Sequence, residues 1–297
     1  MDAVLLTERV QELRDDRSHG ASWMARRAVE TLIELSEMEV SSSEELLERL
    51  RNAARQLAGC RPGVGAVAGA VGRVLAAAGH ESHLDVDDLR RVVQEEARAL
   101  DDARRRAAAS ITIQLRERLD GATVITHSAS GTVREAFQQT RPARIICTVS
   151  EPVGEGREFA DEWRSAGYDV ELVDDEKAPA RVADTSLLLI GADTVFRDGT
   201  ICNKVGTIPL AKAAADAGVP TIVAAEVIKV APVPGSQAPE FADIERSLFE
   251  LVPPELISEV VTEEGTFTPD NIAALVDRIP FLKEGYPLVL PVSAGRR

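Results

Sequence analysis

The second half of the chain contains five short apolar segments, and they constrain the fold more than any other feature. They are TVITH (123–127), RIICTV (144–149), YDVELV (168–173), SLLLIGAD (186–193) and PTIVAAE (220–226). Runs of this kind are buried on both faces of a sheet, and the helical stretches between them imply parallel strands with crossover connections. The pattern predicts an α/β fold in which residues 120–297 form a Rossmann-like, doubly wound parallel sheet domain.

Residues 3–119 follow a different pattern. Apolar residues recur there at helical spacing, as at Ala28, Leu32 and Leu35, and the alternation of strands is absent. The serines at 41–43, followed by two glutamates, are typical of a helix start, and residues 85–119 read as one long charged helix. Since a length of 297 residues also suggests two units, we expect a helical domain over residues 1–119 whose last helix connects the two parts.

The chain is acidic, with 49 Asp and Glu residues against 34 Lys and Arg residues and a net charge of −15. Such a surface lacks the basic patch that attracts phosphate backbones, so we expect no direct binding to nucleic acid. Few of its basic residues are lysine. An acidic, lysine-poor surface suits a salt-rich cytoplasm, and this explanation needs no functional role for the charge.

The sequence contains no recognisable targeting segment. Its first 16 residues carry charges throughout, unlike a secretory signal, and no apolar run approaches the ~18 residues that span a bilayer. Cys60, Cys147 and Cys202 lie far apart, so they predict reduced thiols and neither a disulfide framework nor a zinc site. We expect a cytoplasmic protein without membrane contact.

Signatures of the common nucleotide cofactors are absent. No G-x-G-x-x-G follows the first predicted strand, and G-x-x-x-x-G-K-[ST] occurs nowhere in the chain. We therefore expect no bound cofactor and no metal ion.

Asp193 directly follows the most apolar predicted strand. Ligands of doubly wound sheets gather beyond the carboxyl ends of the strands. Partial burial there could shift the pKa of the Asp193 carboxyl, which could then move protons to and from a bound sugar. The alternative is an aspartate that only caps the end of a strand.

A second candidate segment is NKVGT at 203–207, which precedes a predicted helix. Backbone amides at a helix start, together with the Lys204 ammonium, provide a place where a phosphate group can bind. The alternative interpretation makes Asn203 a helix N-cap and Lys204 a solvated charge.

Three further segments carry small and polar residues at expected helix starts. THSASGTVREAF (126–137) follows the first predicted strand, but its adjacent His127 and Ser128 point to opposite faces of a strand and so do not form a nucleophilic pair. HGA at 19–21 and the RP pair at 61–62 lie in the helical half, where small residues more often indicate tight helix packing than ligand contact.

These segments, in this order, resemble a known family. It comprises the α, β and δ regulatory subunits of translation initiation factor 2B together with methylthioribose-1-phosphate isomerase and ribose-1,5-bisphosphate isomerase. The resemblance covers nearly the whole chain through HGA (19–21), RP (61–62), THS (126–128), SEPVGEGRE (150–158), GAD (191–193), NKVGT (203–207) and PPELISEVVTEEG (253–265).

The resemblance implies two kinds of site residue. In the isomerases a cysteine and an aspartate carry the aldose-to-ketose conversion, and their positions correspond to Ser128 and Asp193. An unassisted serine hydroxyl cannot move a proton near neutral pH as a thiol can. Two ligand-contact elements are altered as well, because His19 stands at an arginine position and the loop at 150–154 differs. The implied ligand and phosphate contacts are Gly20, Ala21, Arg61, His127, Glu155, Arg157, Asn203, Lys204, Gly206 and Thr207.

The serine at position 128 decides which function we predict. We expect an initiation factor 2B-like regulatory or binding protein, without catalysis, whose pocket takes a phosphorylated sugar or a nucleotide. The alternative is an aldose-ketose isomerase acting on ribose-1,5-bisphosphate or methylthioribose-1-phosphate, with Asp193 assisted by Ser128 or Cys202. The resemblance also implies self-association into a homodimer or hexamer and, as a further partner, an initiation factor GTPase.

Overall fold

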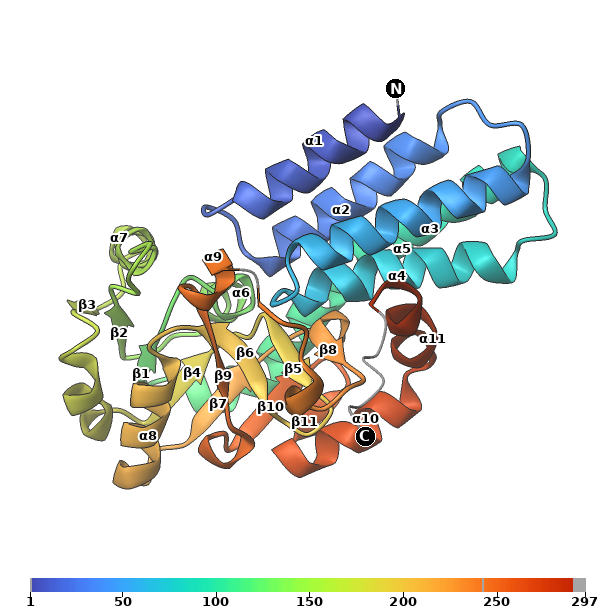
Figure 1. Ribbon diagram of the computed structural model, residues 1–297. Helices are drawn as coiled ribbons and strands as arrows, with labels where there is room; N and C mark the ends of the chain where they lie inside the picture. Colours follow the sequence, from blue (N-terminus) through green and yellow to red (C-terminus); the bar gives the residue numbers. More distant parts are fainter. Residues whose placement is uncertain (1, 242, 291–297) are drawn as a thin grey trace.

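The structure is a computed structural model that describes residues 2–241 and 243–290. A bundle of helices formed by the first part of the chain lies along one side of an α/β domain (Figure 1). The expected combination of an N-terminal helical region with a Rossmann-like parallel sheet is confirmed.

The helical region contains five helices. They are α1 (Asp2–Asp15), α2 (Ala21–Ser36), α3 (Ser43–Cys60), α4 (Gly65–His80) and α5 (Val86–Leu119). The predicted start near residue 42 is correct, because the Ser42 side chain accepts a hydrogen bond from the Glu45 amide at 3.2 Å. The predicted long helix is α5, whose start is capped in the same way by Asp85.

Helix α4 lies at the centre of this region, where its glycines and alanines allow close packing. A Cβ at Gly72 would lie 2.6 Å from the carbonyl oxygen of Gly285 on α11 (Pro280–Val289), and one at Gly69 would collide with the carbonyl oxygen of Ile228. The small residues after Arg61 therefore allow tight helix packing, which is the interpretation that the sequence favoured over ligand contact.

The main sheet has seven strands in the order β11-β10-β7-β4-β1-β2-β3. The five predicted apolar segments form its parallel part: β1 (Thr123–Thr126), β2 (Arg144–Thr148), β3 (Val170–Val173), β4 (Leu187–Ile190) and β7 (Thr221–Ala224). β10 (Glu259–Thr262) extends it in parallel and β11 (Gly265–Phe267) closes it antiparallel. From β1 the chain adds β2 and β3 on one side of the sheet and then crosses back to add β4 and β7 on the other side. Ligands of such sheets bind where the strand order reverses, which here is at the ends of β1 and β4.

A second, four-stranded sheet in the order β8-β5-β6-β9 was not expected from the sequence. Its strands are β5 (Thr194–Phe196), β6 (Ile201–Lys204), β8 (Val230–Ala231) and β9 (Phe249–Val252). The remaining helices of the second half are α6 (Gly131–Gln138), α7 (Gly156–Ser165), α8 (Thr207–Ala217), α9 (Asp243–Arg246) and α10 (Ile272–Arg278). Asn203 and Lys204 therefore end a strand, and they precede helix α8 as the sequence predicted.

The hydrophobic core of the helical region continues into the small sheet. Phe196 and Cys202 of the sheet, with Tyr286 of α11, belong to the same buried cluster as the side chains of α2, α3 and α4. This shared packing fixes the helical region against the strand ends, and so fixes the walls of any site between them. Among the described residues, no helix has both the length and the apolar character needed to cross a membrane.

Candidate functional site

A cavity of about 120 Å³ lies where the loop after α1 faces the ends of β1, β4 and β6. Seven of the site residues expected from the sequence line it: Gly20, Ala21, Arg61, Ser128, Glu155, Asp193 and Lys204. Residues from both halves of the chain thus converge on one concave site, next to the strand ends where doubly wound sheets bind ligands.

Asp193 connects β4 to β5 and presents its carboxylate to this cavity. Its backbone amide donates to the Cys202 carbonyl at 2.9 Å, which fixes the residue between the two sheets. Burial raises the pKa of its carboxyl to about 6, although the positive charges of Lys229, Arg61 and Lys204 oppose this shift. No described side chain donates a hydrogen bond to the carboxylate. A carboxyl with this pKa can accept or release a proton near neutral pH.

Ser128, Glu155 and Lys204 form a hydrogen-bonded chain along the wall of the cavity. The Ser128 hydroxyl donates to Glu155 Oε1 at 2.6 Å, and the Lys204 ammonium donates to Glu155 Oε2 at 3.1 Å. Ser128 has a left-handed backbone with φ of 66°, and its amide donates to Ser150 Oγ at 2.8 Å. The Ser128 side chain is therefore fixed in orientation, with a carboxylate as its acceptor.

Arg61 lines the cavity, but its guanidinium group is already held by protein groups. It is 2% exposed, and its Nη1 donates to the carbonyl oxygens of Leu13 at 3.1 Å and Asp16 at 2.9 Å. Its Nε lies 3.5 Å from Glu245 Oε1, and the Glu245 side chain is fully buried. Arg61 thus ties the loop after α1 to the segment around α9.

His127, expected to contact a ligand, is buried beside the cavity and does not line it. Its Nδ1 lies 2.7 Å from Thr148 Oγ1, and its Nε2 lies 2.8 Å from the Val205 carbonyl oxygen. Burial lowers the pKa of this imidazole, so it stays neutral at physiological pH. Both ring nitrogens have protein partners, which makes His127 a link between β1, β2 and the turn before α8.

Asn203, Gly206 and Thr207 build the turn into α8 and do not line the cavity. The Asn203 amide donates to Thr207 Oγ1 at 3.0 Å, and the Thr207 hydroxyl donates to the Lys204 carbonyl at 2.6 Å. The first turn of α8 is closed by Glu250, whose carboxylate accepts from the Ile208 amide at 2.8 Å. The open helix terminus that the sequence analysis assigned to a phosphate is therefore occupied by a carboxylate of β9.

Arg157, another expected ligand contact, lies on the outer surface. Its guanidinium pairs with Glu151 at 2.9 Å, and both side chains are more than half exposed. It lies outside the cavity, although the loop that carries it reaches the cavity through Val153 and Glu155.

The sequence analysis did not identify Arg17 as a cavity residue. Its Nη1 donates to the Asp16 carbonyl at 2.7 Å, and no described carboxylate pairs with it. His19 stacks on Trp23 with ring centroids 3.9 Å apart, and its Nδ1 lies 2.7 Å from Asp16 Oδ2. Arg17 stands two positions before His19 in the sequence. This proximity is the signal that could have placed an arginine side chain in the cavity.

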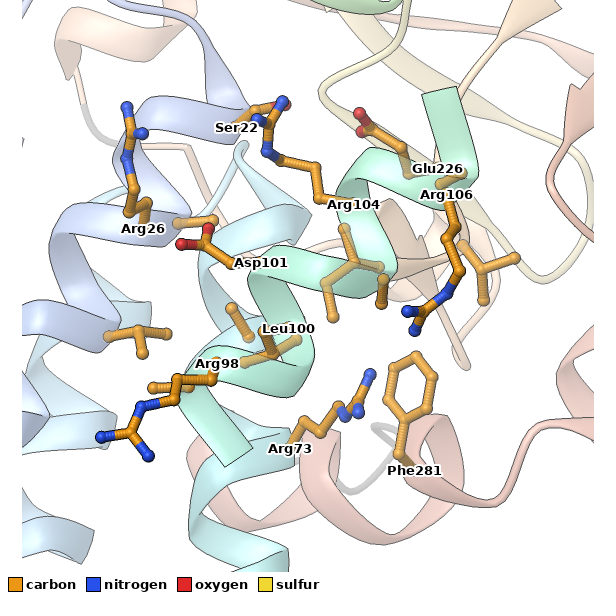
Figure 2. A pocket seen from close by; sticks show the side chains of 18 of the residues that line it. Ser22, Arg26, Arg73, Arg98, Leu100, Asp101, Arg104, Arg106, Glu226 and Phe281 are labelled. Carbon is orange, nitrogen blue, oxygen red and sulfur yellow. The ribbon is translucent and has the colours of Figure 1, made fainter. Parts of the chain in front are cut away.

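A larger cavity of about 760 Å³ lies along the middle of α5, between α2, α4 and the segments at 226–228 and 279–281 (Figure 2). Arginines of three helices surround it, together with Asp101 and Glu226 (Figure 2). Alanines and branched apolar side chains also line it. None of the site residues expected from the sequence lines this cavity. We place the functional site in the smaller cavity because seven of the expected site residues line it, next to the ends of the parallel strands.

One buried ion pair connects a residue of the larger cavity with the electrostatics of Asp193. Glu226 lines the larger cavity, and its carboxylate lies 3.3 Å from the Lys229 ammonium. Lys229 is in turn the main positive charge that acts on Asp193. Within the described part of the chain, no group of three or more His, Cys, Asp or Glu residues is placed to hold a metal ion.

Comparison with known proteins gives consistent similarities. The profile of the initiation factor 2 subunit family matches residues 17–269. A Pyrococcus abyssi protein named as translation initiation factor eIF-2B subunit 2-like is 31% identical over 280 residues, covering 88% of this chain and 96% of its own. The ribose 1,5-bisphosphate isomerase of Archaeoglobus fulgidus is 29% identical over 293 residues, covering 91% of each chain.

Solved structures support the fold. The Pyrococcus horikoshii translation initiation factor eIF-2B superposes with a TM-score of 0.75 at 23% identity, covering 89% of this chain and 97% of that one. A chain of the tetrameric eIF2B-beta2-delta2 complex from C. thermophilum gives a TM-score of 0.76 at 19% identity, covering 94% of this chain and 95% of its own.

Proposed function

Because this chain belongs to the initiation factor 2 subunit family, we propose that it is a non-catalytic regulatory or binding protein whose smaller cavity accepts a phosphorylated sugar or a nucleotide. Relatives carry the names of initiation factor subunits and of two sugar-phosphate isomerases, so membership alone agrees with either role. The observation that carries the proposal is the chemistry at position 128. A serine hydroxyl stands there, and it donates to Glu155.

Aldose-ketose isomerisation moves protons between neighbouring carbons and oxygens, so it needs two groups that titrate near neutral pH. Asp193, with a pKa of about 6, meets this requirement. The Ser128 hydroxyl does not, because the pKa of an alcohol is far higher than the pKa of a thiol. The cavity thus keeps one of the two groups that the reaction uses.

No cysteine replaces the missing thiol. All three cysteines lie within the described part of the chain, all are buried, and none lines the cavity. Cys202, the nearest to Asp193 in sequence, belongs to the core of the helical region, and burial raises the pKa of its thiol well above the usual value. These positions favour structural roles for the thiols.

The second candidate function is sugar-phosphate isomerisation. The raised pKa of Asp193 favours it, because the shift produces a proton carrier in the right place. In this case Ser128, with Glu155 as proton acceptor, would have to do the work of the cysteine. We rank this function second because the Glu155 carboxylate is already engaged by both the Ser128 hydroxyl and the Lys204 ammonium.

One experiment separates the two functions. The pure protein, in high salt to suit its acidic surface, is incubated with ribose 1,5-bisphosphate and with methylthioribose 1-phosphate, and the ketose product is measured beside the thermal shift. Binding without product supports the proposal. Turnover that disappears in Asp193→Asn establishes the isomerase instead. If no phosphorylated ligand shifts the melting temperature, the proposed pocket function is wrong.

The same role includes protein partners. We propose that the chain associates with itself and that its helical region docks on an initiation factor GTPase. A neighbouring structure is titled a tetrameric complex, which agrees with self-association in this fold. Light scattering after size-exclusion chromatography at several salt concentrations tests the first part, because a monomer under all conditions contradicts it.

A further inference from the structure

The Lys204 ammonium already has an anion beside it. Glu155 Oε2 lies 3.1 Å from Lys204 Nζ, and Glu155 Oε1 accepts from the Ser128 hydroxyl at 2.6 Å. The Lys204 side chain is 6% exposed and that of Glu155 is 24% exposed. A hydroxyl and an ammonium that converge on one oxyanion are the donors that a phosphate group would use. The Glu155 carboxylate thus stands where a phosphate would be expected.

The position of Glu155 is built into the fold. It directly precedes α7, yet its side chain does not cap that helix. The loop before it is anchored by Asp175, whose carboxylate accepts from the amides of Ser150 at 2.8 Å and Glu151 at 2.7 Å. This anchoring directs the Glu155 side chain into the cavity. An exposed glutamate, in contrast, would sample many rotamers.

Gly156 fixes the other end of this loop. A Cβ at this position would collide with the carbonyl oxygen of Thr148, so the chain passes the end of β2 at a distance that only glycine permits. The loop therefore cannot retreat from the sheet without breaking this packing. The backbone is thus fixed both before Glu155, at Ser150 and Glu151, and after it, at Gly156, and this holds the Glu155 carboxylate beside Lys204.

Of the other charged side chains of the cavity, Arg17 is a cation without a described carboxylate partner, and the rest do not offset the Glu155 carboxylate. Arg61 is paired with the buried Glu245, and Asp193 adds a second carboxylate whose pKa Glu155 helps to raise. A phosphate dianion placed beside Lys204 would meet the charge of Glu155 at once, and like charges at short distance repel strongly in a partly buried site.

We propose that Glu155 is a specificity-determining residue, an internal carboxylate that occupies the anion position between Lys204 and Ser128. A phosphate ester binds in this position only when the carboxylate is displaced, whereas an uncharged sugar meets no such competition. This inference rests on the proposed function, because it sets which ligands the same cavity accepts.

Glu155→Gln tests the inference. The amide keeps the shape of the side chain and an oxygen that can accept from Ser128, but it removes the charge beside Lys204. Glu151→Gln is the matched control, because it removes one charge from the same loop at an exposed residue that pairs with Arg157 outside the cavity. Isothermal titration calorimetry measures ribose 1,5-bisphosphate, inorganic phosphate and ribose on each variant.

We expect Glu155→Gln to bind the bisphosphate about tenfold more tightly than the wild type, since a charge-assisted hydrogen bond is worth about that factor. Glu151→Gln is expected to match the wild type. Ribose binding is expected to be the same in all three proteins.

The outcomes separate the inference from the proposed function. Equal affinity of wild type and Glu155→Gln for the bisphosphate overturns the role of Glu155 and leaves the binding function in place. Failure of both folded proteins to bind any phosphate overturns the binding function itself. If Glu155→Gln melts early, Glu155→Ala at a lower temperature replaces it, and unchanged phosphate affinity there contradicts the inference equally.

Discussion

Lys229 and Glu226 form an ion pair of 3.3 Å in which each side chain is 5% exposed. Glu226 lines the larger cavity, and Lys229 is the strongest of the positive charges that counter the raised pKa of Asp193 in the smaller one. The protonation of the candidate site residue thus depends on a buried pair three residues apart on η2 (Val227–Lys229) and its N-cap.

Removing this pair as a unit is predicted to raise the pKa of Asp193 above about 6. The double variant Lys229→Met with Glu226→Gln takes away the positive charge and avoids leaving a lone buried carboxylate, which would cost about 3 to 5 kcal/mol. Carboxyl-detected NMR titration of Asp193 measures the shift. A pKa that stays at its wild-type value would show that Lys229 does not act on this group.

Asp193 is predicted to lower the stability of the protein at neutral pH. Its pKa is raised from 3.8 to about 6 on folding, so the folded state binds more protons than the unfolded state between these values. Stability therefore falls as the pH rises through this window, and the loss is complete at about pH 7, one unit above the folded-state pKa.

Asp193→Asn should consequently stabilise the protein by about 1 to 3 kcal/mol at pH 7.5. The difference from the wild type should shrink below pH 6 and vanish below about pH 3, where the carboxyl is protonated in both states. Urea denaturation at several pH values measures it. A variant less stable than the wild type at pH 7.5 would contradict the cause assigned to the shift, which is burial.

The main sheet and the helical region were predictable because their signals are local. Uninterrupted apolar runs such as Leu187–Ile190 are buried on both faces, and the helical periodicity of residues 21–36 continues for several turns. Family motifs then placed Asp193 and Lys204 in one site, and the structure brings both to the same cavity.

The small sheet and the charge partners of the site were not predictable in this way. β6 is four residues long and ends in Asn203 and Lys204, whose polar character gives no strand signal, and its partner β9 lies more than 40 residues further along the chain. The pairing of Glu155 with Lys204 likewise joins residues 49 positions apart. Such contacts arise only from the packed arrangement of both sheets.

Gly206 is predicted to be indispensable for the turn into α8. Its φ is 99°, and a Cβ there would lie 2.9 Å from the His127 ring, which is itself locked by two hydrogen bonds. Gly206→Ala should lower the free energy of unfolding by about 2 to 3 kcal/mol, from backbone strain and the clash together.

Gly218 provides the control for this substitution. It has a left-handed φ of 68° at the other end of the same helix, but open space surrounds its missing Cβ. Gly218→Ala should therefore cost only the strain, about 1 kcal/mol. Equal losses in the two variants would show that the contact with His127 contributes nothing.

The last prediction concerns Arg61, which the family resemblance assigns to phosphate binding. In the structure its guanidinium holds the carbonyl oxygens of Leu13 and Asp16 and faces the buried Glu245, so we expect a mainly structural role. Arg61→Met should destabilise the protein by about 3 to 5 kcal/mol, because it removes one partner of a buried ion pair together with the hydrogen bonds to Leu13 and Asp16. Adding Glu245→Gln should recover part of this loss, and chemical denaturation of both variants measures it. If Arg61→Met instead keeps the wild-type free energy of unfolding but loses phosphate binding, Arg61 is a ligand residue. Its contacts with the loop after α1 then contribute nothing to stability.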